Sequence, residues 1–583
     1  MFWAIENPDR LLQEKRAMDD LAASAEWLHA VRWALTKEVL LKVDADITIG
    51  HETFAVELVY PSFFPDTPAF VRPRSATKRW SSHQYGPGGV LCLEWGPDNW
   101  SATVTGANLL ESTYRLLCCE HGTDETRQSA PSRHRSTFGQ EVRLSTARIV
   151  YTPAIREYLR GIPSSKEYGL AARTIFHSRS TIVFISEVSR TNGDSLTATD
   201  IPTGLLECGP LFAWSTKGHL FKSDDFNSAM HFASCQELLD AIHEVGFTDF
   251  KLLPTPTRDD ENIILLVAKD AVPRAFSVKA GENTIEECTV IDSGEEPKER
   301  RPPEYRLLSE KKVGIVGLGS VGSKVAVSLA RCGVRKFLLV DDDVMLARNI
   351  SRNELNWASV GENKADAVKE ALLLIGPGIE VQIRPIRIAG QESPEVASTV
   401  LDALANCDLL IDATASASVL VQLAAVAKRR KTPLIWGEVF AGGIGGLLVR
   451  SRPGKDLEPL DMRSGVHQYL RTLPKAPFRL AAGYDADSDA APIIAFDAEV
   501  TQFAATLTAF ALDTLLLREP SAFPYSAYLI GYKSEWIFEA PFHTQPILVN
   551  TPGVEAGRLT KDETEPAQPG ALLADVIIQQ DEC

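Results

Sequence analysis

A glycine-rich turn between an apolar strand and a helix limits this chain more than any other feature. Residues 313–316 read as a buried strand, and Gly317, Gly319 and Gly322 follow at the spacing that opens a helix. Glycines permit a tight turn and a close approach of the backbone to phosphate groups, while a helix N-terminus favours negative charge. The pattern predicts a nucleotide site, and taken alone it suits a dinucleotide-binding oxidoreductase equally well.

Strand and helix patterns alternate regularly after this turn. Short apolar runs with strand character are separated by segments of helical spacing, in the order 313–316, 323–331, 336–340, 363–374, 380–388 and 409–411. This order predicts a doubly wound, Rossmann-like parallel sheet in the C-terminal half of the chain.

Four polar residues follow the glycine turn in a fixed order. Asp341 ends the strand 336–340, and Asn349, Arg352 and Lys364 come after it. This order resembles the ThiF-type adenylyltransferase family, shared by ubiquitin-activating enzymes and activators of sulfur carriers, closely over residues 305–420. The resemblance favours adenylyl transfer over a dinucleotide oxidoreductase.

The resemblance implies a role for each of these residues and ATP as the cofactor. Asp341 matches the ribose-binding acid, and Asn349 and Arg352 match the phosphate contacts. Lys364 matches the catalytic lysine, beside charge that develops during adenylyl transfer. Arg352 and Lys364 are therefore the expected catalytic residues of this domain, and the three glycines complete the expected cofactor site.

The expected magnesium site departs from the family pattern. The family has a second acid three residues after a strand-ending Asp, whereas this chain has Asp412-Ala413-Thr414-Ala415. Ala415 has no oxygen with which to bind a cation. Either Asp412 alone serves as the magnesium ligand or metal handling is altered.

A second resemblance lies near the N-terminus. Tyr60-Pro61, Pro68, His83 and Cys92 are followed by Trp100, and over about residues 8–120 this order resembles the ubiquitin-conjugating family. The resemblance implies that Cys92 accepts the activated carrier as a thioester, which needs an exposed thiol able to ionise.

The residue that supports the oxyanion in that family is missing from its place. The family's His-Pro-Asn is replaced by His83-Gln84-Tyr85. Asn99, Ser101 and Asn108 are alternative donors, and the sequence does not choose among them.

The activating half also lacks the catalytic cysteine that relatives carry. No cysteine lies between Cys407 and Cys583. Three explanations stay open: direct transfer to Cys92, an oxyester on Ser488 or else Ser464, or use of Cys583. A hydroxyl nucleophile would need a base, and His467 is the only histidine nearby in the sequence.

Length, charge and cysteine usage set the remaining expectations. A chain of 583 residues predicts several domains, and the net charge of −17 argues against nucleic-acid binding. Scattered cysteines and the lack of a membrane-length apolar run indicate a cytoplasmic protein with no membrane partner. The expected parts are a conjugating-like α+β domain with a helix over 9–36, a linker and α/β connecting domain, an adenylation domain and a tail, at 1–121, 122–300, 301–542 and 543–583.

Together these features predict a bacterial-type fusion of conjugating and activating enzymes that forms a homodimer by analogy. The chain would adenylate the C-terminus of a ubiquitin-like protein, pass it to Cys92 and conjugate it to a target amine. A second candidate carrier is the C-terminus of a nucleotide cyclase in an antiphage system. Two competing interpretations of the whole chain are a sulfur-carrier adenylyltransferase and a binding scaffold whose enzymatic sites have decayed.

Overall fold

The computed structural model divides into two compact units, residues 1–144 and 145–583. It describes residues 3–74, 80–81, 83–85, 88–121, 138–143, 145–189, 195–206, 213–226, 232–252, 262–269, 272–292, 302–440, 442–474 and 495–549. Within these ranges, no helix combines the length and the apolar character that crossing a bilayer requires.

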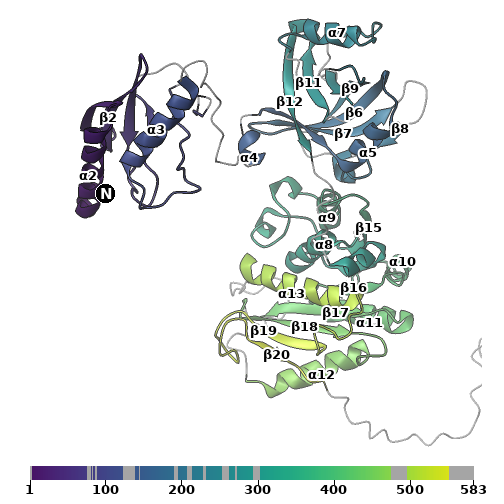
Figure 1. The fold of residues 1–583 in the computed structure, drawn as a ribbon. Coiled ribbons are helices and arrows are strands. Elements are labelled where there is room, and N and C mark those ends of the chain that lie inside the picture. Colours follow the sequence, from purple (N-terminus) through teal and green to yellow (C-terminus); the bar gives the residue numbers. More distant parts are fainter. Residues whose placement is uncertain are drawn as a thin grey trace, which may run out of the picture. The chain divides into compact units, whose positions relative to one another are not determined.

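The first unit is an antiparallel sheet with helices before and after it (Figure 1). Its four strands pair in chain order, β1-β2-β3-β4. The elements are α1 Trp3–Glu6, α2 Pro8–Ser24, β1 Leu28–Leu35, β2 Leu41–Ile49, β3 Glu52–Val59, β4 Phe70–Pro73, α3 Gly106–His121 and α4 Phe138–Glu141.

The single helix expected over 9–36 is wrong. Helix α2 ends at Ser24, and the second half of that range forms β1, which pairs with β2 from Leu28 opposite Ile47 to Leu35 opposite Leu41. Apolar residues near helical spacing occur in both halves, so the sequence pattern alone did not separate them. Cross-strand pairing overrides local propensity once a neighbouring strand is present.

A buried polar network joins α2 to the start of α3. The Glu14 carboxylate accepts hydrogen bonds from the Tyr60 hydroxyl at 2.9 Å and from the Gly106 N–H at 2.7 Å, and it pairs with Arg10 at 2.7 Å. Burial raises the pKa of Glu14 despite these contacts. Next to this region, Ser112 of α3 accepts the Glu94 N–H at 3.0 Å, so α3 holds the segment that follows Cys92.

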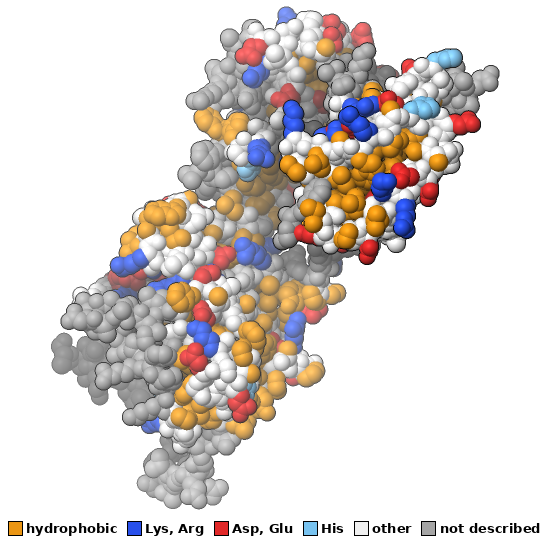
Figure 2. Space-filling view, turned by 90° about the vertical axis from the view of Figure 1, so that its left-hand side faces the viewer, with side chains coloured by type: hydrophobic (Ala, Val, Ile, Leu, Met, Phe, Trp, Pro, Cys, Tyr) orange, Lys and Arg blue, Asp and Glu red, His pale blue; other side chains and the backbone are white. Residues whose placement is uncertain are grey.

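Hydrophobic side chains gather on the exposed face of the first unit that Figure 2 presents. Among the large hydrophobic residues of this unit, Ile5, Leu12 and Phe63 are 78%, 50% and 77% exposed. Hydrophobic side chains gathered on one face, as Figure 2 shows, are typical of a site of contact with another protein.

The middle of the chain forms a sheet that closes on itself. Its strand order is β5-β12-β11-β10-β9-β6-β7-β8, and β5 also pairs with β7, which joins the two sides of the ring. The elements are β5 Ala147–Tyr151, α5 Pro153–Gly161, β6 Lys166–Phe176, β7 Thr181–Ser189, β8 Ser195–Thr197, α6 Thr203–Leu206, β9 Ala213–Lys222, α7 Cys235–Glu244, β10 Asn262–Val267, β11 Arg274–Lys279, η1 Ala280–Glu282 and β12 Thr284–Asp292.

The last third of the chain contains the parallel sheet that the sequence predicts. Five parallel strands lie in the order β15-β14-β13-β16-β17, and β18, β19 and β20 extend the sheet antiparallel. The strands are β13 Lys312–Val316, β14 Lys336–Val340, β15 Glu380–Arg384, β16 Leu409–Asp412, β17 Leu434–Phe440, β18 Gly445–Ser451, β19 Ala527–Gly531 and β20 Thr544–Pro546. The antiparallel extension was not predicted.

Helices cover both faces of this sheet (Figure 1). Alternate strand residues face opposite sides: Phe337 and Leu339 pack in one core cluster with α8, α9 and α13, and Leu338 packs in the other with α10, α11 and α12. The helices are η2 Pro303–Glu310, α8 Ser320–Cys332, η3 Ala347–Asn349, η4 Trp357–Ser359, α9 Lys364–Leu373, α10 Pro394–Leu404, α11 Ala417–Arg430, α12 Pro459–Thr472 and α13 Asp497–Leu515. The sheet is thereby buried on both sides, as a doubly wound arrangement requires.

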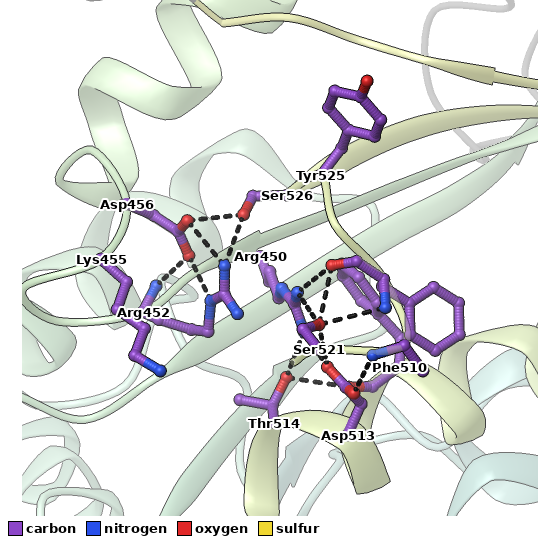
Figure 3. Close-up of polar contacts among 12 residues, drawn as sticks. Arg450, Arg452, Lys455, Asp456, Phe510, Asp513, Thr514, Ser521, Tyr525 and Ser526 are labelled. Carbon is purple, nitrogen blue, oxygen red and sulfur yellow. Dashed lines mark hydrogen bonds and ion pairs between the residues drawn. The ribbon is translucent and has the colours of Figure 1, made fainter. Parts of the chain in front are cut away.

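A buried ion pair fastens the antiparallel extension to α13 (Figure 3). Arg450 of β18 and Asp513 of α13 are 2.7 Å apart, and both side chains are almost fully buried. The guanidinium also donates to Ser521 at 3.0 Å and to the Phe523 carbonyl oxygen at 2.7 Å, and it lies over the Phe510 ring. These bonds satisfy a charge that would otherwise be costly to bury.

Candidate functional site

The glycine turn brings the start of α8 close to the end of β13. Gly317 has a φ of 86°, a conformation that side chains disfavour, and its N–H bonds to the Val340 carbonyl oxygen at 2.9 Å. A Cβ atom on Gly322 would lie too close to the Gly317 backbone for any side chain, whereas one on Gly319 would meet nothing within 4 Å. Gly322 is therefore needed for the turn itself, and Gly319 leaves space beside the helix N-terminus.

Asp341 lies at the carboxyl end of β14 and is tied to the glycine turn. Its carboxylate accepts the Leu318 N–H at 2.6 Å and the Asp343 N–H at 2.8 Å. Burial raises the pKa of Asp341, although both bonds and the charge of Lys364 act in the opposite direction. The residue expected to bind ribose thus has a fixed orientation next to the expected phosphate site.

Lys364 is the first residue of α9 and is buried. Its N–H donates to the Asp343 carbonyl oxygen at 2.9 Å, and its ammonium forms an ion pair with the Asp343 carboxylate. Burial opposes ionisation of Asp343, but the bond to Lys364 and its charge outweigh it and hold the Asp343 pKa below its usual value. Asp341, Asp343 and Lys364 therefore form one cluster at the end of β14.

Asn349 and Arg352 lie in the segment between β14 and α9. The side-chain oxygen of Asn349 accepts a hydrogen bond from the Leu346 N–H at 2.9 Å. The backbone carbonyl oxygen of Asn349 accepts one from the Arg352 N–H at 3.1 Å. Arg352 is partly buried. The same turn therefore sets the backbone position of both expected phosphate contacts.

Asn353 is a site residue that the sequence analysis missed. It is buried, its side chain donates to the Leu318 carbonyl oxygen of the glycine turn at 3.4 Å, and it accepts the Leu355 N–H at 3.1 Å. It thereby links the loop that carries Arg352 to the glycine turn. No signal in the sequence could have found it, because its partner Leu318 lies 35 residues away in the chain.

Asp412 ends β16, directly beside β13. It is 3% exposed, and one carboxylate oxygen accepts both the Thr414 hydroxyl at 2.6 Å and the Thr414 N–H at 3.0 Å. Burial raises its pKa, opposed by the bonds from Thr414. Ala415 follows with a φ of 55°.

The carboxylates near Asp412 bear on the expected magnesium site. Across the described part of the chain, no three Asp, Glu, His or Cys side chains are grouped as metal ligands. Magnesium bound to a nucleotide usually takes only one or two carboxylates, with phosphates and waters completing its shell. Asp412 fits as one such ligand, and Ala415 cannot supply a second.

Cys92 lies in a short antiparallel pairing in the first unit. Its N–H donates to the His83 carbonyl oxygen at 2.7 Å, Gln84 pairs with Leu91, and the Tyr85 N–H donates to the Val90 carbonyl oxygen at 2.9 Å. Cys92 is partly exposed, as expected for a reactive thiol.

Tyr85 takes the place beside this thiol. Its side chain is 74% exposed, and the charge of Cys92, then burial and a hydrogen bond with Cys92, raise the pKa of the tyrosine. The three expected donors make local bonds instead: Asn99 with Gly96 and Glu94, Ser101 with Thr103, and Asn108 with Thr105. The sequence analysis missed Tyr85 because only folding of the pairing brings it to the thiol.

The structure describes Ser464 among the alternative nucleophiles of the activating half. Ser464 is exposed on α12, and His467 lies one turn further along the same helix. The pKa of His467 is lowered by burial and by Arg463 and Arg471. Ser488 and Cys583 lie outside the described residues.

Comparison with known proteins identifies a domain within this region. The model of the ThiF family matches residues 298–456. ATP-dependent ubiquitin transferase-like protein Cap2 of Enterobacter hormaechei is 39% identical over 118 residues, which are 20% of this chain and 19% of that protein. Molybdopterin-synthase adenylyltransferase of Escherichia coli is 34% identical over 131 residues, 22% of this chain and 50% of that protein.

The chain thus contains a ThiF-type domain. The matched part of the chain spans about a fifth of the length of Cap2 and about half the length of the molybdopterin-synthase adenylyltransferase. A solved structure, that of E. coli MccB with ATP, is similar over 43% of this chain and 67% of that one, at 20% identity and a TM-score of 0.33. That likeness adds nothing to the strand order described above.

Proposed function

We propose that this chain uses ATP to adenylate the C-terminal carboxylate of a carrier protein. The observation that carries the proposal is the gathering of Asp341, Lys364 and the glycine turn at the carboxyl ends of β13 and β14, within the region that matches the ThiF family. Ligands of such sheets bind at this edge. The relatives named as a ubiquitin transferase-like protein and an adenylyltransferase support the same reaction class.

In the proposed reaction, a carboxylate oxygen of the carrier attacks the α-phosphorus of ATP. A new P–O bond forms, the bond to the β-phosphate bridging oxygen breaks, and pyrophosphate leaves. Asp341 would bind the ribose, Asn349 and Arg352 would hold phosphate oxygens, and Lys364 would stabilise the charge that develops on them. Bound magnesium, with Asp412 as one ligand, would further neutralise phosphate charge.

We further propose that the acyl group then passes to Cys92 and on to an amine. The Cys92 sulfur would attack the acyl carbon, AMP would leave, and the thiol proton would pass to solvent. A target amine would then attack the thioester and release the thiol. The carrier is proposed to be a ubiquitin-like protein, with the C-terminus of a nucleotide cyclase in an antiphage system as the alternative. The homodimer, cytoplasmic location and domain boundaries predicted above stay predictions.

Pyrophosphate exchange tests the first step. Full-length protein is incubated with ATP, labelled pyrophosphate and either a ubiquitin-like protein or a nucleotide cyclase with a free C-terminus. We expect carrier-dependent label in ATP, its loss in Lys364→Ala, and its retention in Lys428→Ala, which changes an exposed lysine on α11. Binding of carriers without any exchange would favour a scaffold and refute the proposal.

Adduct formation tests the second step. We expect Cys92→Ala to keep exchange activity and to lose a carrier adduct that thiols cleave. An adduct that survives this substitution would refute the role of Cys92. Exchange with transfer of sulfur, and no Cys92 adduct, would instead support the sulfur-carrier alternative.

A further inference from the structure

We propose that Asp343 is a positioning residue for Lys364, and that nucleotide phosphates compete with its carboxylate for the lysine ammonium. This inference rests on the proposed nucleotide site and adds a residue to it. Asp343 would hold the cation in place before ATP binds and take it back as pyrophosphate leaves.

The first support is the way the backbone places the pair. Residues 343–345 and 361–364 form a short antiparallel pairing, with an isolated bridge between Val344 and Asn363. Met345 exchanges hydrogen bonds at 2.8 Å with Gly361 and Glu362, and the Lys364 N–H bonds to the Asp343 carbonyl oxygen at 2.9 Å. This pairing fixes the backbone of Asp343 next to that of Lys364, so their side chains start from neighbouring positions.

The second support is the unequal exposure of the two side chains. The Lys364 side chain is 8% exposed and that of Asp343 is 60% exposed. The carboxylate therefore forms the solvent side of the pair. One of its oxygens also accepts the Val344 N–H at 2.8 Å, which fixes its direction. A phosphate group that approaches from solvent would therefore come close to the Asp343 carboxylate before it could pair with the Lys364 ammonium.

The third support is the local charge. Asp341, Asp342 and Asp343 follow β14, and Lys364 is the cation that pairs with the last of them. The Asp343 carboxylate is thus the counter-ion of the buried Lys364 ammonium. A polyphosphate can replace that carboxylate as counter-ion, whereas an uncharged ligand such as adenosine cannot. The pair should therefore oppose phosphate binding selectively.

Asp342 offers a matched control for a test. It is the neighbouring acid, it is exposed, and it has the same formal charge. Binding of ATP, inorganic pyrophosphate and adenosine to the full-length protein would be measured by calorimetry for wild type, Asp343→Asn and Asp342→Asn. Asp343→Glu tests rescue, because it retains a carboxylate.

We expect Asp343→Asn to bind ATP and pyrophosphate at least about fivefold more tightly, as removal of one nearby like charge implies, and to bind adenosine unchanged. Asp342→Asn should change all three by less than about twofold. In pyrophosphate exchange, Asp343→Asn should lower both KM for ATP and kcat, because the lysine binds phosphate better but is less well placed. Asp343→Glu should restore values near wild type.

Two results would overturn the inference. One is phosphate affinity in Asp343→Asn that matches wild type or Asp342→Asn. The other is an equal gain from Asp343→Asn in a Lys364→Ala background, since the effect must pass through the lysine. Either result leaves the proposed adenylation intact, whereas a wild-type chain that binds no ATP would refute both proposals.

Discussion

Separate alanine substitutions at Gly322 and Gly319 should show that Gly322 maintains the turn and that Gly319 leaves space for a phosphate group. A Cβ on residue 322 would lie 3.0 Å from the carbonyl carbon of Gly317, closer still to its oxygen, and 3.3 Å from the Ala413 Cβ. These neighbours are backbone or close-packed, and Gly317 is held by its 2.9 Å bond to Val340. Relief therefore requires movement of the turn or of the start of α8.

Overpacking of this kind costs about 1–3 kcal/mol. Each kcal/mol lowers the midpoint of a domain of this size by roughly 2–4 °C. Gly322→Ala should therefore lower the thermal transition of the C-terminal domain and weaken ATP binding. Gly319→Ala adds a Cβ with nothing within 4 Å, so its transition should match wild type. It should still weaken ATP binding, because the new methyl group occupies space beside the helix N-terminus.

The assay is differential scanning calorimetry of the full-length protein, with and without ATP, together with calorimetric titration of ATP. A Gly322→Ala protein as stable as wild type would refute the reasoning about the turn. Normal ATP binding by Gly319→Ala would refute the assignment of phosphate to this helix N-terminus.

Three further outcomes can be measured on the same protein. Asp513→Asn leaves the Arg450 charge buried without a counter-ion, so thermal scans should show a loss of about 3–5 kcal/mol. Burial would raise the Asp513 pKa, but bonds from Arg450 and Ser521 hold it below its usual value. The contribution is therefore complete above the unfolded pKa of about 4, and the two proteins should converge as pH falls through the lower folded value. Tyr85→Phe should slow alkylation of Cys92 by iodoacetamide several-fold at neutral pH, and an unchanged rate would remove the phenol from the site. Burial raises the Cys407 pKa to about 12. After treatment with an alkylating reagent at pH 8, mass spectrometry should therefore find Cys407 unmodified in the folded protein and alkylated in urea.

The parallel sheet, and with it the place of the proposed nucleotide site, could be predicted because the signals are local. Gly317 and Asp341 each follow directly on an apolar strand, Asp412 ends one, and parallel strands bring their carboxyl ends to one edge. Lys364 could be placed because it opens the next helix. The sequence order of these residues therefore carries most of the site.

Contacts made only in the folded chain could not be predicted. Asn353 reaches Leu318, 35 residues away in the sequence, and Arg450 reaches Asp513, 63 residues away. Neither pair has a periodic or spacing signal. The helix expected over 9–36 failed for a related reason, because the partner strand that makes β1 a strand is known only after folding.

The closed sheet of the middle segment limits how that segment can meet other molecules. Among the residues that the structure describes, β5 pairs with β12 and β7, and β7 pairs with β6, β5 and β8. The three-residue β8 is therefore the end of the strand order. A strand with so few free backbone groups is a poor template for an incoming peptide. Recognition by this part of the protein would have to use side chains on loops and helices rather than β-augmentation, and the same closure guards it against edge-to-edge aggregation.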